Sequence, residues 1–573
     1  MPHITVAHEP LLAADPLRVA DDAACEALLR CWIRETGAEV PSGEPLRLPF
    51  PAAGIRVEAR VLYRSACGHH RLGTPRRPGR EMSPAELARA IAVEAWARGI
   101  APPGAHDRLA ALVEESAARV ADHVAVRRAS IDAPGQPHFL AAEQALLLGH
   151  PFHPTPKSRE GSPAELAELS PELRGSFRLH WMAVRPALLA GGSAGAPPRE
   201  LARALAPPDL RLPADMVPIP VHPWQARDLA TRPGVRALLE AGMVVDLGRA
   251  GDLWYPTSSL RTVWRPGAVH QLKLSLGMRV TNSRRENLRA ELELGVQAHR
   301  LMAAGLGAAL ALQHPRFRVL TDPAWLGVDV PGAREGGFEV ALRRNGIGSS
   351  TRVQCLAGLT AERPDRPASL LGELVADLAS VVRRPREEIA EGWFSRYLDA
   401  ALAPLLWLRA TAGVALEAHQ QNTLVALDGV GWPAGAWYRD SQGWYVAASK
   451  ADAVRRLLPG FGDGVEAIFD DALVDERLEY YLGVNNVLGL VGAMGAQGLA
   501  DEEALLRRLR SALLGLRRRL RPAPALVESL LESPTLACKA NLLHALDGKD
   551  ELVGSVDAQS VYVRIPNPLA EVG

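Results

Sequence analysis

The chain has 573 residues, 47% of them hydrophobic, which is enough for a large core and too many for one compact domain. Lys plus Arg and Asp plus Glu both number 65, so the formal net charge is zero and no basic stripe favours nucleic-acid binding. We therefore expect two or three lobes around a cleft for small molecules, with no nucleic-acid partner.

Cysteine usage and hydropathy indicate a cytoplasmic protein. The five cysteines are scattered and odd in number, and no CxxC pair suggests a disulfide framework or a thiolate zinc site. The first ten residues have neither a basic start nor an apolar run, and no apolar stretch is long enough to span a bilayer. We expect no export and no membrane partner, and the sequence leaves a homodimer open.

The first part of the chain, up to about residue 147, is predicted to be mostly helical. Apolar residues recur at helical spacing, and Ser83 with Glu86 forms a capping box with proline at the first helical position. Ser162 and Glu165 repeat this signal.

The next part, 176–344, contains strands separated by Pro and Gly turns, and the chain is mainly helical again from about Leu370. One hairpin, formed by 423–427 and 444–448, is expected within the helical part. The chain thus divides into three zones of different composition.

The segment 271–281 is predicted to form one long strand with an apolar and a polar face. Its even positions are apolar, whereas Lys273 is among the polar odd positions, which could face solvent or a site. Ser283 and Glu286 resemble a capping box, so Arg285 is expected in the first turn of a helix that runs to about 302. A cation there adds to the positive helix end, which favours an anionic ligand.

A proline-rich loop, GHPFHPTPKSREG at 149–161, carries His150, His153, Lys157 and Arg159. Anion binding by Lys157 and Arg159 is the preferred interpretation. A rigid turn with exposed cations is one alternative, and a zinc site of the two histidines is another, although no third ligand stands nearby.

Two further short motifs carry polar residues. VHPWQ at 221–225 has a single histidine that we interpret as structural. SSLRT at 258–262 offers hydroxyls and a guanidinium suited to phosphate or carboxylate oxygens, but such clusters also occur in ordinary loops.

EAHQQN at 417–422 is predicted to end an amphipathic helix before a strand, and Asp440 follows at the next turn. Asn422 and Asp440 are plausible hard oxygen ligands for Mg²⁺ on nucleotide phosphates, and His419 could neutralise a carboxylate or move a proton. Buried hydrogen bonding is the alternative. The chain has no GxxxxGK[ST], GxSxG or HExxH motif, and GLVGAMGAQG at 489–498 is interpreted as a helix end and loop.

In this order, GHPFHPTPKSREG, VHPWQ, SSLRT, KLSLGMRVTNSRREN, EAHQQN and YRD resemble the landmarks of the IucA/IucC family, the siderophore synthetases that act independently of non-ribosomal peptide synthetases. The landmarks span about 150–440, and Lys539 resembles a further carboxy-terminal element. The resemblance implies an α+β, hand-like fold with a helical thumb-like domain at 1–147, a sheet-rich fingers-like domain at 148–345 and a mainly helical palm-like domain at 346–573.

The resemblance also implies an ATP- and Mg²⁺-dependent ligase. A carboxylate would attack the α-phosphate to give an acyl-adenylate and pyrophosphate, and an amine, hydroxylamine or alcohol would then displace AMP. The implied ATP-binding residues are Ser259, Arg261, Thr262, Lys273, Lys157, Gln421, Asn422 and Asp440, with His153 approaching the same group, and Glu417 would help Asn422 and Asp440 with magnesium.

The implied acid-binding residues are Thr281, Arg285 and His419. The expected catalytic set is Arg285, His419, Lys273 and His153. Citrate is the favoured acid, and 2-oxoglutarate or a mono-acylated citryl or succinyl derivative remains open. A non-catalytic citrate or siderophore binder, a zinc hydrolase and a phosphotransferase are the competing classes.

Overall fold

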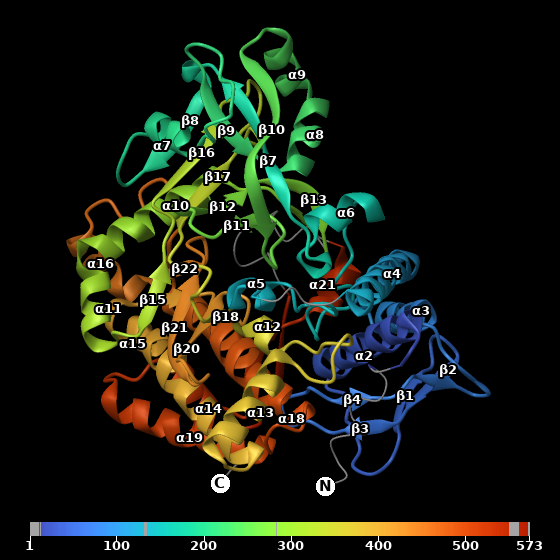
Figure 1. Ribbon diagram of the computed structural model, residues 1–573. Coiled ribbons are helices and arrows are strands. Elements are labelled where there is room, and N and C mark those ends of the chain that lie inside the picture. Colours follow the sequence, from blue (N-terminus) through green and yellow to red (C-terminus); the bar gives the residue numbers. More distant parts are fainter. Residues whose placement is uncertain (1–10, 12, 131–134, 282, 549–560, 571–573) are drawn as a thin grey trace.

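The computed structural model describes residues 11, 13–130, 135–281, 283–548 and 561–570. The N-terminal region is built on three long helices beside small sheets (Figure 1). Both capping boxes are confirmed, since Ser83 and Ser162 each accept a hydrogen bond from the N3 backbone and each N3 glutamate returns one. The elements are α2 (Pro16–Thr36), α3 (Pro84–Ala97), α4 (Ala105–Ala129), α5 (His138–Glu143), β1 (Leu46–Phe50), β2 (Ile55–Ala59), β3 (Val61–Tyr63), β4 (Arg71–Leu72), β5 (Arg76–Arg77) and β6 (Arg80–Glu81).

The middle region is dominated by an eight-stranded antiparallel sheet in the order β8-β16-β17-β12-β11-β10-β7-β9 (Figure 1, top). Its strands are β7 (Phe177–Val184), β8 (Leu189–Ser193), β9 (Val217–Val221), β10 (Val244–Pro256), β11 (Thr262–Trp264), β12 (His270–Leu274), β16 (Ala324–Val328) and β17 (Val340–Arg344). Beside it lie α6 (Pro163–Leu169), α7 (Pro198–Leu205), α8 (Pro223–Thr231) and α9 (Pro233–Glu240).

The prediction of one strand over 271–281 is wrong, and the environment of its polar face, which the sequence left open, is now visible. The segment forms two strands, β12 in the large sheet and β13 (Leu276–Val280) in a separate hairpin. The polar positions are buried as well, with Gln271, Lys273 and Ser275 at most 5% exposed. The polar face of β12 therefore faces other protein groups, and the solvent-facing interpretation is excluded.

Arg285 lies in a strand and not in a first helical turn. β14 (Ser283–Arg285) pairs antiparallel with β13, and α10 (Arg289–Leu301) begins only after it. The Ser283–Glu286 pattern is local, whereas strand pairing engages the backbone of the whole segment, so the expected capping box does not form. The argument from the helix end does not apply to Arg285.

The C-terminal region combines three further sheets with a large helical core. The strand at 423–427 is confirmed, but β20 (Thr423–Leu427) pairs with β21 (Pro433–Arg439), whereas β22 (Trp444–Ala447) joins β19 (Val414–Leu416) in another sheet, so the expected hairpin is wrong. Residues 417–422 follow β19 and do not end a helix. The stretch 489–498 is a helix end followed by a turn, as expected: α18 (Gly489–Ala496) is the buried last part of a helical segment, and residues 497–498 form a turn.

Other elements complete this region and its connection to the middle sheet. They are α11 (Gly307–Gln313), β15 (Phe317–Leu320), β18 (Val353–Cys355), α12 (Leu356–Thr360), α13 (Leu370–Val382), α14 (Arg386–Tyr397), α15 (Ala403–Ala412), α16 (Ala451–Leu457), β23 (Ile468–Phe469), α17 (Asp471–Leu478), the π-helix η7 (Glu479–Leu488), α19 (Glu502–Arg519), α20 (Ala525–Glu532), β24 (Thr535–Lys539), α21 (Asn541–Asp547) and β25 (Tyr562–Pro566).

Separate hydrophobic cores underlie the three regions, and the mixed α+β class is confirmed. The strands and helices of 166–342 share one core, and a larger core lies within 294–569. The N-terminal core also includes Leu542 and Leu546 of α21, which lies beside α2 and α4 (Figure 1). No helix within the described ranges is both long and apolar enough to cross a membrane.

Candidate active site

A cleft of ≈ 790 Å³ lies where the three regions meet, a size typical of small-molecule sites. Every site residue expected from the sequence lines it, although they come from distant parts of the chain. These residues are His153, Lys157, Ser259, Arg261, Thr262, Lys273, Thr281, Arg285, Glu417, His419, Gln421, Asn422 and Asp440. The cleft shows that they are neighbours, and their individual roles stay predictions.

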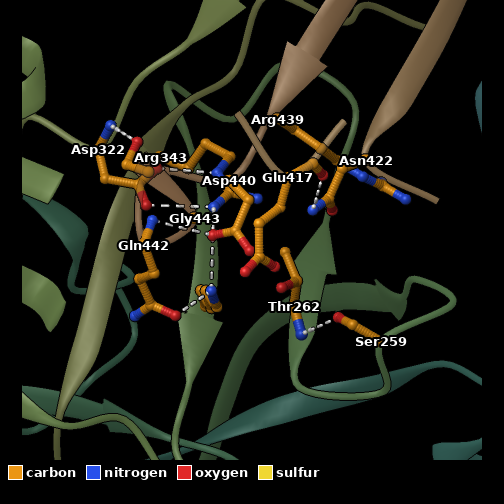
Figure 2. Close-up of polar contacts among 12 residues, drawn as sticks. Ser259, Thr262, Asp322, Arg343, Glu417, Asn422, Arg439, Asp440, Gln442 and Gly443 are labelled. Atoms are coloured by element: carbon orange, nitrogen blue, oxygen red, sulfur yellow. Dashed lines mark hydrogen bonds and ion pairs between the residues drawn. The ribbon is translucent and has the colours of Figure 1, made fainter. Parts of the chain in front are cut away.

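Asp440 and Lys273 form the centre of a buried charge cluster. Lys273 Nζ lies 2.9 Å from Asp440 Oδ1 and also donates to Gln442 Oε1. Arg343 lies 3.4 Å from the same Asp440 oxygen and holds Asp322 at 2.8 and 3.1 Å. Figure 2 shows Asp440 between Arg343 and the loop of Ser259 and Thr262. Asp440 adopts φ 115°, a strained backbone that places its carboxylate at the end of β21.

Burial and charge pull the pKa values of this cluster in opposite directions. Burial lowers the pKa of Lys273 more than Asp440 raises it. Burial would raise the pKa of Asp440, but Lys273 and Arg343 outweigh it and hold the carboxyl well below its usual range. Asp440 is thus ionised at neutral pH, and Lys273 lies in a site of low polarity, where an arriving phosphate would interact strongly.

The loop 257–262 presents hydroxyl groups beside Lys273. Thr262 pairs with Lys273 across β11 and β12, and its N–H donates to Ser259 Oγ at 3.1 Å. Leu260 has φ 64°, which turns the loop back on itself, and the Thr257 N–H donates to the Thr262 carbonyl at 2.9 Å. Strand register and one tight turn therefore place this motif next to the lysine.

Arg261 and Arg285 differ from Lys273 because they contact only neutral oxygens. Arg261 donates to the Arg285 carbonyl at 2.9 Å and to Asn287 Oδ1 at 3.0 Å, and burial lowers its pKa to about 10. Arg285 donates to Thr281 Oγ1 at 3.1 Å. Among the described residues, neither guanidinium has a carboxylate within ion-pair distance. Two cations without counter-ions in one cleft make it suited to an anion.

The 417–422 turn also lines the cleft. The Asn422 N–H donates to the His419 carbonyl at 3.0 Å, and Asn422 Nδ2 donates to the Glu417 carbonyl at 3.1 Å. Burial lowers the pKa of His419 to about 4, so the imidazole is neutral at neutral pH. Burial raises the pKa of Glu417, whose carboxylate accepts from Tyr445 Oη. A Cβ at Gly443 would lie 2.7 Å from the Glu417 side chain, so glycine is needed there.

The 149–161 loop has a different arrangement from the one expected for anion binding. Lys157 and Arg159 both pair with Glu172, and all three are at most 5% exposed. His150 and His153 each accept a backbone N–H, from Phe152 and Thr155 at 3.1 Å. Within the part of the chain that the structure describes, no three His, Cys, Asp or Glu side chains gather as metal ligands, which removes the support for a zinc site. His222 caps α8, as a structural histidine should.

Sequence reasoning missed several residues that hold the site together. Arg343 and Gln442 contact the Asp440 cluster, and Arg439 pairs with buried Glu143 at 2.7 Å. Glu143 also accepts the Ser258 N–H at 2.8 Å, so a helix of the N-terminal region anchors the serine loop. None of these lies in a distinctive motif apart from Arg439 in YRD, and they come from different elements: Arg343 from β17, Glu143 from α5 and Gln442 from the segment after β21.

The residues fit a nucleotide polyphosphate. Arg261 and Lys273 offer desolvated positive charge, and the serine loop offers hydroxyl donors. They also fit Mg²⁺, which takes one or two carboxylates together with phosphate oxygens and water. Asp440 and Glu417 supply carboxylates, and Asn422 supplies an amide oxygen.

Comparisons with known proteins agree with this cleft. The IucA / IucC family model matches residues 138–361, and a ferric iron reductase FhuF-like transporter model matches 391–554. The rhizobactin siderophore biosynthesis protein RhbC of Rhizobium meliloti is 40% identical over 568 residues, covering 95% of this chain and 97% of the relative. The spermidine-citrate ligase of Bacillus anthracis is 36% identical, covering 75% and 73%.

Solved structures show the same architecture. The ATP-bound aerobactin synthetase IucA from Klebsiella pneumoniae superposes with a TM-score of 0.87 at 28% identity, covering 96% of this chain and 99% of that one. Aerobactin synthetase IucC has a TM-score of 0.72 at 19% identity, which supports the fold alone. The length and identity of the first relative, together with the family match over the cleft, show that the chain belongs to the IucA/IucC family of siderophore synthetases.

Proposed function

We propose that the protein is an ATP-dependent ligase that activates citrate as an acyl-adenylate and joins it to an amine, hydroxylamine or alcohol. The observation that carries the proposal is a single cleft in which no carboxylate of the described residues lies within ion-pair distance of Arg261 or Arg285, beside the Lys273–Asp440 cluster. Relatives named as spermidine-citrate ligase and L-2,3-diaminopropanoate–citrate ligase support citrate and an amine. The ATP-bound relative supports the nucleotide.

In the first step, an oxygen of the acid forms a bond to the α-phosphorus, and the bond to pyrophosphate breaks. Two anions must meet, so the site has to supply positive charge that is already in place. Lys273 and Arg261 would hold the phosphates together with Ser259 and Thr262. Thr281, Arg285 and His419 would hold the acid.

In the second step, the nucleophile forms a bond to the acyl carbon, AMP leaves, and the nucleophile loses a proton. His419 is neutral at neutral pH and could accept that proton, and an already neutral amine could instead release it to water. Magnesium would neutralise phosphate charge, and Asp440, Asn422 and Glu417 would hold it. We place this chemistry in the cytoplasm, where ATP is supplied.

The test measures pyrophosphate and AMP released from MgATP, with hydroxylamine as nucleophile, against citrate, 2-oxoglutarate, succinate and no acid. Citrate-dependent release with formation of a citryl hydroxamate supports the proposal. Pyrophosphate release with 2-oxoglutarate alone would show that 2-oxoglutarate, and not citrate, is the acid substrate. Release of ADP would indicate a phosphotransferase. Failure to bind MgATP would indicate a non-catalytic binder. The same assay without magnesium tests whether pyrophosphate release requires the metal.

A further inference from the structure

Further positive groups line the cleft near His150. Arg34, in the last turn of α2, lines the cleft together with His150 and Lys539. Desolvation in the cleft, followed by the charges of neighbours that include Arg34, His419 and Lys539, lowers the pKa of His150. Two positive groups from distant segments, Arg34 and Lys539, therefore line the cleft near the neutral His150.

The Arg34 guanidinium is held firmly but has no counter-ion. Its carbon lies 3.1 Å from the centre of the Phe152 ring, and its Nη2 donates to the Cys67 carbonyl at 2.9 Å. A Cβ at Gly68 would lie 3.0 Å from Nη2, so glycine leaves room for this position. In the described part of the chain, no carboxylate forms an ion pair with Arg34.

A helix-end role explains only part of this arrangement. A cation in the last helical turn stabilises a helix by about 0.3–1 kcal/mol wherever its side chain points. It does not require a stacked guanidinium that lines a cleft. Arg34 is partly exposed, and guanidinium is well matched to carboxylate, so it is available to an anion that enters the cleft.

The position of Arg34 selects which part of the acid it would bind. The carboxylate that reacts must reach the phosphates, and hence it must face Arg261 and Lys273. An acid held by His419 would have its remaining carboxylates near His150 and Arg34, because His150 Nε2 lies 3.1 Å from Asn485 Nδ2 and Asn485 Oδ1 accepts the Gln420 N–H at 3.1 Å. Resting on the proposed function, we infer that Arg34 binds a carboxylate of the acid that does not react, and so selects polycarboxylic substrates.

The experiment compares acids that lack one carboxylate. Citrate, 3-hydroxyglutarate, which lacks the central carboxylate, and citramalate, which lacks a terminal one, are assayed by acid-dependent pyrophosphate release. The variants are Arg34→Gln and Arg34→Lys. Arg108→Gln is the matched control, because Arg108 also joins the N-terminal region to the C-terminal segment, through the Leu546 carbonyl, but does not line the cleft.

We expect Arg34→Gln to lower kcat/KM for citrate about 10- to 100-fold, as for loss of a charged hydrogen bond, and to leave KM for ATP unchanged. For the analogue that lacks the carboxylate bound by Arg34, kcat/KM should differ between wild type and Arg34→Gln by less than about threefold, because the carboxylate that Arg34 would bind is already absent. Arg34→Lys should recover part of the loss, and Arg108→Gln should match the wild type. Arg34→Lys keeps the test valid if Arg34→Gln does not fold.

Equal losses with all three acids, or a raised KM for ATP, would overturn the inference, since Arg34 would then act through structure or on the nucleotide. An unchanged citrate kcat/KM in the folded Arg34→Gln variant would overturn it too. Wild-type protein that releases no pyrophosphate with citrate would instead refute the proposed function itself.

Discussion

Two groups of cations line the cleft, and they differ in whether the protein supplies their counter-ion. Lys157 has Glu172, which it shares with Arg159, and these groups are almost fully buried. Arg261 and Arg285 have only carbonyl, amide and hydroxyl oxygens. The sequence shows both groups as basic residues in polar motifs.

The difference indicates different functions. A buried cation that is neutralised by a fixed carboxylate stabilises the fold, since removing one partner leaves an uncompensated charge. A cation without a carboxylate at ion-pair distance gains most when an anionic ligand arrives. On this comparison, the Glu172 cluster holds the loop in place, and Arg261 and Arg285 await substrate.

The largest expected effect tests the structural side. Glu172→Gln removes the counter-ion of two buried cations and should destabilise the protein by about 3–5 kcal/mol, measured by denaturant titration. KM for ATP should stay within about twofold in the folded fraction. Unchanged stability with a raised KM for ATP would show that Lys157 serves the phosphates, as the sequence suggested.

Lys273→Gln tests the site directly. The lysine is buried, and it lies next to Asp440 and the serine loop, so its loss should lower citrate-dependent pyrophosphate release about 10²- to 10³-fold, as for removal of one preorganised electrostatic group. Arg344→Gln, at the end of β17, is an exposed control. A variant that folds and keeps the wild-type rate would remove Lys273 from the nucleotide site.

Site residues in short motifs could be predicted from the sequence, whereas isolated site residues could not. Contiguous motifs such as SSLRT and EAHQQN place their own residues correctly in one cleft, because a short loop moves as a unit. Arg343, Gln442 and Glu143 were not found, since one arginine, glutamine or glutamate among many has no local signal, and only tertiary contacts place it beside Lys273, Asp440 or Arg439.

Errors in the predicted elements have a related cause. The Ser283–Glu286 pattern predicts a helix start, but pairing of β14 with β13 decides the conformation of Arg285. The alternation in 271–281 correctly predicts which residues face the hydrophobic core. It cannot show that the polar residues on the other face are buried as well. Domain boundaries at 147 and 345 stay a prediction, and packing of Leu542 into the N-terminal core shows that the cores do not follow the chain order alone.

Arg285→Ala tests the cations that have no ion pair among the described residues. The side chain is partly exposed and has only Thr281 and a backbone carbonyl as contacts, so stability should change by less than about 0.5 kcal/mol. Acid activation should fall about 10- to 100-fold through KM for the acid. A folded variant with normal citrate-dependent pyrophosphate release would contradict the assignment.

Glu35 is the converse case, a buried carboxylate without an ion pair among the described residues. It accepts the N–H groups of Leu542 and Leu543 at 2.9 and 2.8 Å, and burial raises its pKa to about 8 despite these bonds. The folded state therefore holds a proton that the unfolded state has lost, from the unfolded pKa of about 4.3 up to about 8.

This gives a stability effect with a defined sign. The contribution of Glu35 is full below the unfolded pKa and is lost as pH rises through the folded pKa, at about 1.4 kcal/mol per pH unit in between. The difference in unfolding free energy between wild type and Glu35→Gln should thus fall between pH 5 and 8 and level off above. If the difference in unfolding free energy instead rises with pH, Glu35 is ionised in the folded protein. The N terminus of α21 would then stabilise the carboxylate without a cation.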